Sequence, residues 1–231
     1  MGLAVTKPAI KAIAFDAFAI FDPRPVFALA EKLFPGKGTE LSTVWRTRQF
    51  EYTWLRTISR TYADFWKLTE DALVFAAKMV KINVSLEQRQ ELMEAYLQLK
   101  AYPDVLPALN SLRDAGLRLA FLTNMSPKML DAAAKNSGLD TMFDHALSTD
   151  AVKTYKPDPI AYQMGIDAFG LDRGEIVFVA FGGWDAAGAK RFGYPTFWVN
   201  RLGLPAEELD ILSDASGATL TELVDFVKRI S

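Results

Sequence analysis

The sequence predicts an α/β protein, a doubly wound, parallel, Rossmann-like sheet with an inserted helical cap subdomain. In the C-terminal half, short apolar runs alternate with helical stretches, as in sheets whose parallel strands are joined by helices. Between the first apolar run and the others, residues 25–100 hold several helical blocks and no convincing strand. The chain has 231 residues, half of them hydrophobic, which is long enough for a core domain and a smaller one.

Four segments are predicted to be buried strands because each is short and apolar and stops at polar or turn residues. In chain order they are residues 10–15 (IKAIAF), 118–123 (RLAFLT), 176–181 (IVFVAF) and 196–199 (TFWV). The helices expected beside them are residues 104–115, 127–137, 157–169 and 184–192. The first of these helices has its apolar residues on one face, namely Val105, Leu106, Leu109 and Leu112.

The inserted segment is predicted to be helical throughout. Its expected helices are residues 25–34, 40–60, 62–80 and 86–99, and Pro103 in "KAYPDV" marks the return to the sheet. We therefore expect residues 1–22 and 100–231 to form the α/β core domain and residues 23–99 to form the cap subdomain.

Composition excludes several classes of function. The formal net charge of −2 gives no basic field for nucleic acid or an acidic membrane surface. The chain has no cysteine, so disulfides, thiolate catalysis and Cys-ligated zinc are excluded. His145 is the only histidine, which excludes a metal site built on several histidines. No apolar run is long enough to span a bilayer, and we expect a soluble cytoplasmic protein.

Polar groups follow several of the predicted strands. Asp16 ends the first strand, Thr123 and Asn124 end the second, Lys156 lies in "TYKPDP" before a helix, and Asp185 follows "FVAFGGW". In open α/β sheets the ligand site lies beyond the carboxyl ends of the strands. The sequence therefore predicts that these side chains converge on one site.

Each of these groups also has a structural interpretation. Asp16 is a common type of turn former, but a carboxylate among apolar residues needs partners, and a nearby cation would keep it ionised as a nucleophile. Taken alone, Lys156 is explained equally well as a functional residue and as an exposed loop lysine. Helix capping explains Ser126 but not the polar pair Thr123-Asn124, whose place beside a helix N-terminus suits an anion.

The remaining candidates are weaker. Asp185 is also explained as an acidic residue in the first turn of a helix, and the glycine pair before it is weak evidence for close approach of a ligand. Arg46, near Arg48, is also explained as a surface ion-pair arginine. The aromatic residues of the inserted segment favour cap packing over a binding wall, namely Phe50, Tyr52, Trp54, Phe65 and Trp66. His145 is assigned no role.

In this order, Asp16, Thr123, Lys156 and Asp185 resemble the four motifs of the haloacid dehalogenase superfamily of hydrolases. The resemblance is closer to the L-2-haloacid dehalogenase branch and covers essentially the whole chain. The segments that carry it are "LSTVWRTRQFEYTWLRT", "YADFWKLTEDAL", "AYPDVLPALNSL", "YKPDPIAYQ" and "GWDAAGAKRFGYPTFWVNR". The superfamily's magnesium phosphatases usually carry a second acid where this chain has Phe18. A metal held mainly by oxygen ligands would be poorly bound here, so the resemblance implies no metal and no cofactor.

The resemblance implies that Asp16 attacks C2 of a short 2-substituted carboxylic acid and that water hydrolyses the resulting ester to a 2-hydroxy acid. Lys156 would orient Asp16, Thr123 would hold the substrate carboxylate, and Asp185 would position the water. Arg46 and Asn124 would receive the halide, with Phe65 beside it, and Tyr162 matches a further active-site position. The expected pocket residues are Phe18, Ile20, Thr47, Phe50, Gly182 and Trp184. The family also implies a homodimer.

This chain departs from the family at Ile20, Ala180 and Gly182, where the dehalogenases usually have polar residues. The departures leave three hypotheses. The first is an L-2-haloacid dehalogenase. The second is a hydrolase that opens the strained ring of L-azetidine-2-carboxylate, and the third is a non-catalytic binding protein. A magnesium phosphatase is a more distant alternative.

Overall fold

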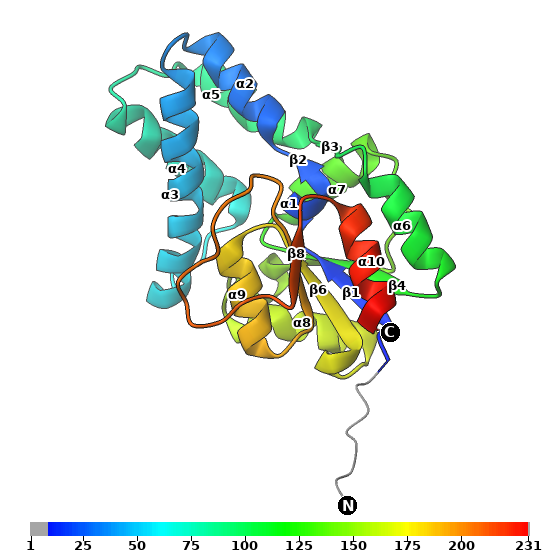
Figure 1. The fold of residues 1–231 in the computed structure, drawn as a ribbon. Helices are drawn as coiled ribbons and strands as arrows, with labels where there is room; N and C mark the ends of the chain where they lie inside the picture. The colour runs from blue at the N-terminus through cyan, green and yellow to red at the C-terminus, as the bar shows by residue number, and fades with distance from the viewer. Residues whose placement is uncertain (1–8, 231) are drawn as a thin grey trace, which may run out of the picture.

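A six-stranded parallel sheet forms the centre of the computed structural model, which describes residues 9–230 (Figure 1). The strand order is β5-β4-β1-β6-β7-β8, and every neighbouring pair is parallel. The strands are β1 (Ala12–Phe15), β4 (Arg118–Thr123), β5 (His145–Ser148), β6 (Ile176–Ala180), β7 (Thr196–Val199) and β8 (Ala215–Gly217). The predicted α/β fold class is confirmed.

Helices cover both faces of the sheet, because alternate side chains of each strand point to opposite faces. In β1, Ile13 and Phe15 belong to one apolar cluster, while Ala12 and Ala14 belong to the other. The first cluster packs against α6 (Val105–Asp114), α7 (Pro127–Asn136) and α10 (Leu220–Ile230). The second packs against α8 (Pro159–Phe169) and α9 (Gly183–Phe192). The sheet is therefore doubly wound.

Four helices are inserted between two very short strands. β2 (Phe21–Asp22) and β3 (Lys100–Ala101) pair antiparallel, with Phe21 opposite Ala101. The inserted helices are α2 (Arg24–Leu33), α3 (Gly38–Ser59), α4 (Phe65–Met79) and α5 (Leu86–Ala95). They lie apart from the sheet at the upper left of Figure 1. The chain thus leaves and re-enters the sheet region at one place.

The structure contains elements that were not predicted from the sequence, namely the strands β2, β3, β5 and β8, the helical turn Ala17–Ile20 and the helix α10. The strands β5 and β8 were not predicted, because they lie at the sheet edges, where the side chains are partly exposed and need not be apolar. Helix α8 begins at Pro159 rather than at residue 157. The side chain of Asp158 accepts the Ile160 N–H and so caps the N-terminus of the helix. His145 opens β5, and its ring packs edge-on against Phe169, with centroids 5.3 Å apart.

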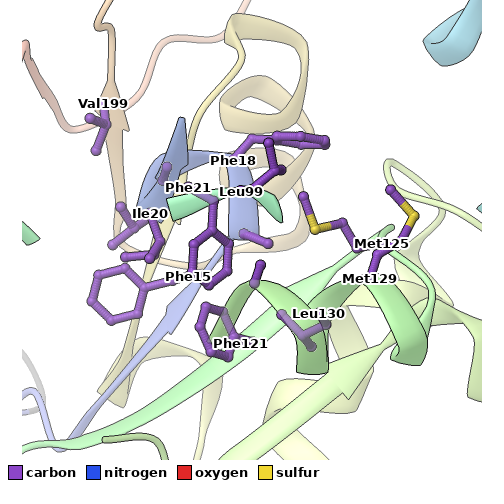
Figure 2. Packing of buried hydrophobic residues seen from close by; sticks show 14 of the residues in the cluster. Phe15, Phe18, Ile20, Phe21, Leu99, Phe121, Met125, Met129, Leu130 and Val199 are labelled. Carbon is purple, nitrogen blue, oxygen red and sulfur yellow. The ribbon is translucent and has the colours of Figure 1, made fainter. Parts of the chain in front are cut away.

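The core below the end of β1 is filled by aromatic and aliphatic side chains. Figure 2 shows Phe15, Phe21 and Phe121 together, with Ile20 on the same side and Phe18 apart from them. The rings of Phe21 and Phe121 are stacked, with centroids 5.6 Å apart. Because these side chains are closely packed, the turn that follows β1 has little conformational freedom.

Gly165→Ala is expected to lower the free energy of unfolding by about 1–2 kcal/mol, although Ala is the better helix former by about 1 kcal/mol. A Cβ at Gly165 would lie 2.6 Å from the Tyr194 hydroxyl, which donates to the Tyr162 carbonyl. Urea denaturation measures the effect. In a Tyr194→Phe background, which removes the clashing oxygen, Gly165→Ala should cost much less; an equal loss in both backgrounds would contradict the packing described here.

Candidate active site

Asp16 lies immediately after β1 and caps the single helical turn α1 (Ala17–Ile20). Its Oδ1 accepts the backbone N–H of Phe18 at 2.7 Å, as an N-cap carboxylate does. The residue is only 2 % exposed. Because a buried carboxylate is costly unless paired, the rest of the site has to supply a cation.

Lys156 supplies that cation from the loop before α8. Its Nζ donates to Asp16 Oδ2 at 2.6 Å and to Asp185 Oδ2 at 2.8 Å, and all three side chains are buried. Burial alone lowers a lysine pKa, but the two carboxylates outweigh burial and raise the pKa of Lys156. The ammonium therefore stays charged and joins the ends of β1 and β6.

Asp185 is the second carboxylate of this pair and lies in the first turn of α9. Burial raises its pKa to about 6, and the Asp16 charge adds to the rise, whereas Lys156 and Tyr162 oppose it. The Tyr162 hydroxyl, on α8, donates to Asp185 Oδ1 at 2.8 Å. Burial and the Asp185 charge hold the pKa of Tyr162 well above its usual value, so this hydroxyl keeps its proton.

Thr123 and Asn124 end β4 beside these charges. Asn124 Oδ1 accepts the backbone N–H of Lys156 at 3.0 Å, which fixes the lysine loop. Asn124 Nδ2 is buried without a hydrogen-bond partner within residues 9–230. The Thr123 hydroxyl accepts the Met125 N–H at 3.2 Å. The free amide donor of Asn124 is the type of group that binds an anion.

Arg46 enters the site from α3 and lies among aromatic rings. Its guanidinium carbon is 4.1 Å from the ring centre of Phe18 and 4.3 Å from that of Phe50, distances typical of cation–π contacts. Nη1 donates to Gln49 Oε1 at 2.8 Å. In the described part of the chain Arg46 forms no ion pair, whereas Arg48 pairs with Glu51. Arg46 thus offers an uncompensated cation.

The other predicted pocket residues are placed differently from one another. Phe65 begins α4, after the Asp64 cap, and its ring centroid is 6.3 Å from that of Phe18. Gly182 caps the N-terminus of α9, and Trp184 lies two residues later, with its ring centroid 5.4 Å from that of Phe50. Thr47, by contrast, is exposed on α3. Ile20 is fully buried in the apolar core, on the same side as Phe15 in Figure 2.

Two aromatic residues that were not predicted to line the site extend the aromatic cluster: Phe181 lies beside Arg46, and Trp54 contacts Trp184. Phe181, directly after β6, lies 5.5 Å from Phe18 and 5.4 Å from Phe50 between centroids. Trp54 packs edge-on against Trp184 at 5.5 Å. Trp54 is four residues after Phe50, so helical spacing indicated a shared face, and Phe181 ends a strand as Asp16 does. Both signals were present, but apolar residues there also fit simple packing.

Residues 9–230 contain neither a cluster of metal-ligating side chains nor a helix that could span a membrane. Among residues 9–230, no three His, Cys, Asp or Glu side chains gather in a way that could hold a metal ion. No helix of the described chain is long and apolar enough to cross a membrane.

The fold and site define a Rossmann-like α/β protein. Beyond the ends of its strands lie the buried groups of Asp16, Lys156 and Asp185, beside the aromatic cluster that surrounds Arg46. The chain belongs to the haloacid dehalogenase-like hydrolase family, whose model matches residues 6–193.

Relatives along nearly the whole chain support this membership. The chain is 42 % identical over 217 residues to the (S)-2-haloacid dehalogenase of Pseudomonas sp. strain YL, covering 94 % of each protein. The structure of the L-2-haloacid dehalogenase RSc1362 matches with a TM-score of 0.94 and 43 % identity, over 96 % of this chain and all of that one. The Xanthobacter autotrophicus L-2-haloacid dehalogenase with chloropropionic acid covalently bound matches at 0.88 and 32 % identity, with the same coverages.

Lys156→Met is expected to lower the free energy of unfolding by about 3–5 kcal/mol at pH 7, because it leaves two buried carboxyl groups without their cation. Without the Lys156 charge, which lowers the pKa of Asp185, this carboxyl group takes up a proton more readily. The loss should therefore shrink as the pH is lowered toward 4 and grow as it rises. Urea denaturation across this pH range measures it. Lys190→Met is the control, because the Lys190–Asp214 pair is about one-third exposed and should contribute less than about 1 kcal/mol. Equal losses in the two variants would contradict a buried pair that controls stability.

Proposed function

We propose that this protein hydrolyses short L-2-haloacids to 2-hydroxy acids through an ester on Asp16. The observation that carries the proposal is the carboxylate of Asp16, which is buried and paired with Lys156. Beside it, the guanidinium of Arg46 packs on the ring of Phe18. The names of the relatives and the covalently bound chloropropionic acid in one of them support the same chemistry.

In the first step a carboxylate oxygen of Asp16 attacks C2 from the side opposite the halogen. The new C–O bond forms as the carbon–halogen bond breaks, and the halide leaves with the bonding electron pair, so C2 is inverted. Lys156 Nζ and the Phe18 N–H hold the two Asp16 oxygens. This fixes the direction of attack, which is the orientation effect that close positioning supplies.

In the second step water attacks the carboxyl carbon of the Asp16 ester. The ester bond at that carbon breaks, and the 2-hydroxy acid leaves with the oxygen that Asp16 donated, while Asp16 keeps the oxygen of water. One proton of the water goes to the product hydroxyl and the other is released. Asp185 is the proposed proton acceptor, since a carboxyl group with a pKa of about 6 is suited to act as a base near neutral pH.

The proposed substrate contacts use an amide donor without a hydrogen-bond partner and a cation without an ion pair in the described chain. Asn124 Nδ2 and the guanidinium of Arg46 are donors that would receive the departing halide. Thr123, with the backbone N–H groups at the start of α7, would hold the substrate carboxylate. The rings of Phe18, Phe50, Phe65 and Trp184 would exclude water from the reacting carbon.

We also propose that residues 23–99 act as the cap subdomain over the core formed by 1–22 and 100–231. This division is supported by the antiparallel β2–β3 pair, through which the chain leaves and re-enters. The residues 1–8 lie outside the described part of the chain. A cytoplasmic location stays a prediction.

The ring opening of L-azetidine-2-carboxylate receives no support from the comparisons, and we do not propose it. The substitution at Ile20 was one reason for that hypothesis, and Ile20 lies in the core. A non-catalytic binding protein is separated from the proposed enzyme by the assay that follows.

Incubation with L-2-chloropropionate is expected to release chloride and the inverted lactate. Asp16→Asn should reduce the rate by at least about 10³-fold, because it removes the attacking oxyanion. The control is Asp22→Asn, a carboxylate six residues away that pairs with Arg24 near the surface and should leave the rate unchanged. No chloride release above that of Asp16→Asn would reject the proposal in favour of a binding protein.

The acid side of the kcat profile, which includes hydrolysis of the ester, is expected to fall about tenfold per pH unit as Asp185, whose pKa is about 6 in the free protein, becomes protonated. Tyr162→Phe removes a hydrogen bond that lowers the pKa of Asp185. The midpoint of the profile should therefore move to higher pH in this variant. Steady-state chloride release between pH 4.5 and 8 (about the range in which carboxyl groups and His titrate) measures the shift. An unchanged midpoint would contradict the role of Asp185.

We propose in addition that the protein is a homodimer that associates through α3 and α4. Leu55 and Ile58 on α3 are 55 % and 80 % exposed, and Met79 at the end of α4 is 64 % exposed. Light scattering after gel filtration should give the dimer mass for the wild type and the monomer mass for Ile58→Lys. Leu202→Lys, which alters an equally exposed leucine elsewhere, should remain dimeric. A monomeric wild type would reject this interface.

A further inference from the structure

Arg201, two residues after the end of β7, contacts the turn that follows Asp16. Its Nη2 donates to the carbonyl of Ala19 at 3.0 Å, and Nε lies 3.4 Å from the same oxygen. Ala19 is three residues after Asp16, within α1. Arg201 itself is mostly buried, with 13 % of its side chain exposed.

The Ala19 carbonyl needs a partner from outside its own helical turn. In an α-helix it would accept the N–H of the residue four positions later, but that residue is Pro23, which has no N–H. The Ala19 N–H is bonded to the Asp16 carbonyl at 3.1 Å. Ala19 therefore connects the backbone of Asp16 on one side to Arg201 on the other.

Arg201 is in turn held firmly by other residues. Its Nη1 and Nη2 each donate to one oxygen of Asp104 at 3.0 Å, the bidentate geometry that favours arginine over lysine. Its guanidinium carbon lies 3.8 Å from the ring centre of Tyr102. Burial raises the pKa of Asp104, but the bonds from Arg201 and from the Leu220 N–H outweigh burial and lower it.

The Tyr102 backbone extends the same link. Its N–H donates to the carbonyl of Ile20 at 3.0 Å, the residue after Ala19. Tyr102 follows β3, where the chain returns from the inserted helices. The end of α1 is thus bound at two successive carbonyls, one by Arg201 and one by Tyr102, and Arg201 packs on Tyr102.

We propose that Arg201 is a positioning residue for the reaction at Asp16: by binding the Ala19 carbonyl it fixes the α1 turn and the direction in which Asp16 attacks. This inference rests on the proposed function, in which Asp16 is the nucleophile. Arg201 touches neither Asp16 nor Lys156 through its side chain in the hydrogen bonds of the described chain. It acts through the backbone of the turn.

The variant Arg201→Ala removes the clamp and leaves every proposed substrate contact in place. It should lower kcat about 10–100-fold, the effect of misplacing reacting groups by about 1 Å, with KM changed less than about twofold. Arg24→Ala is the matched control: Arg24 forms a bidentate pair with Asp22 and lies 5.4 Å from the same Tyr102 ring. It should keep the wild-type kcat.

Rescue separates positioning from general loss of structure. Methylguanidinium at a few millimolar, about a thousandfold below denaturing concentrations, should restore part of kcat in Arg201→Ala, whereas methylammonium, which has no fork, should not. Arg201→Lys should recover little for the same reason. Unchanged kcat in Arg201→Ala, or a rise of KM at constant kcat, would overturn the proposal.

A crystal structure of Arg201→Ala decides the question without any assay. The proposal predicts that the contact of 2.6 Å between Asp16 Oδ2 and Lys156 Nζ is lengthened or lost, and an unchanged contact would overturn it. If the wild type releases no halide, the proposed function fails. The Arg201→Ala structure then still tests whether Arg201 positions Asp16.

Discussion

The structure depends on one buried ammonium group shared by two carboxylates. Lys156 Nζ lies within 2.8 Å of carboxylate oxygens of both Asp16 and Asp185. Asp16 follows β1, Asp185 lies in the first turn of α9, and Lys156 lies in the loop before α8. None of these charges is tolerable in the core without the others. The ends of β1 and β6 therefore have to lie side by side, as their parallel pairing places them.

The second constraint is that the site is built from both parts of the chain. Asp16 and Asn124 directly follow the strands β1 and β4, and Lys156 lies in the loop before α8. The helices α3 and α4 supply Arg46, Phe50 and Phe65. The guanidinium of Arg46 is held against aromatic faces rather than by a carboxylate. Within residues 9–230, Arg46 forms no ion pair with a carboxylate.

Much of this arrangement follows from the sequence, because it depends on local patterns. An acid after a buried strand and a polar pair after the next strand are visible without coordinates, and they point to Asp16 and to Thr123-Asn124. The segment "TYKPDP" before a helix points to the neighbourhood of Lys156. The features that could not be predicted from the sequence depend on tertiary contacts. The edge strand β5 is held by its neighbour β4, the direction of Ile20 is set by core packing, and Arg201 reaches Ala19 across 182 positions. No local pattern encodes such contacts.

In the proposed mechanism Asp16 carries the substrate as an ester and takes its new oxygen from water. A single turnover in ¹⁸O-enriched water, with enzyme in excess over L-2-chloropropionate and the digest read by mass spectrometry, tests it directly. If the ester forms, the heavy oxygen appears in the peptide containing Asp16 and not in the 2-hydroxy acid. Heavy oxygen in the product, with the Asp16 peptide unlabelled, would mean that water attacks C2 itself and would contradict an ester on Asp16.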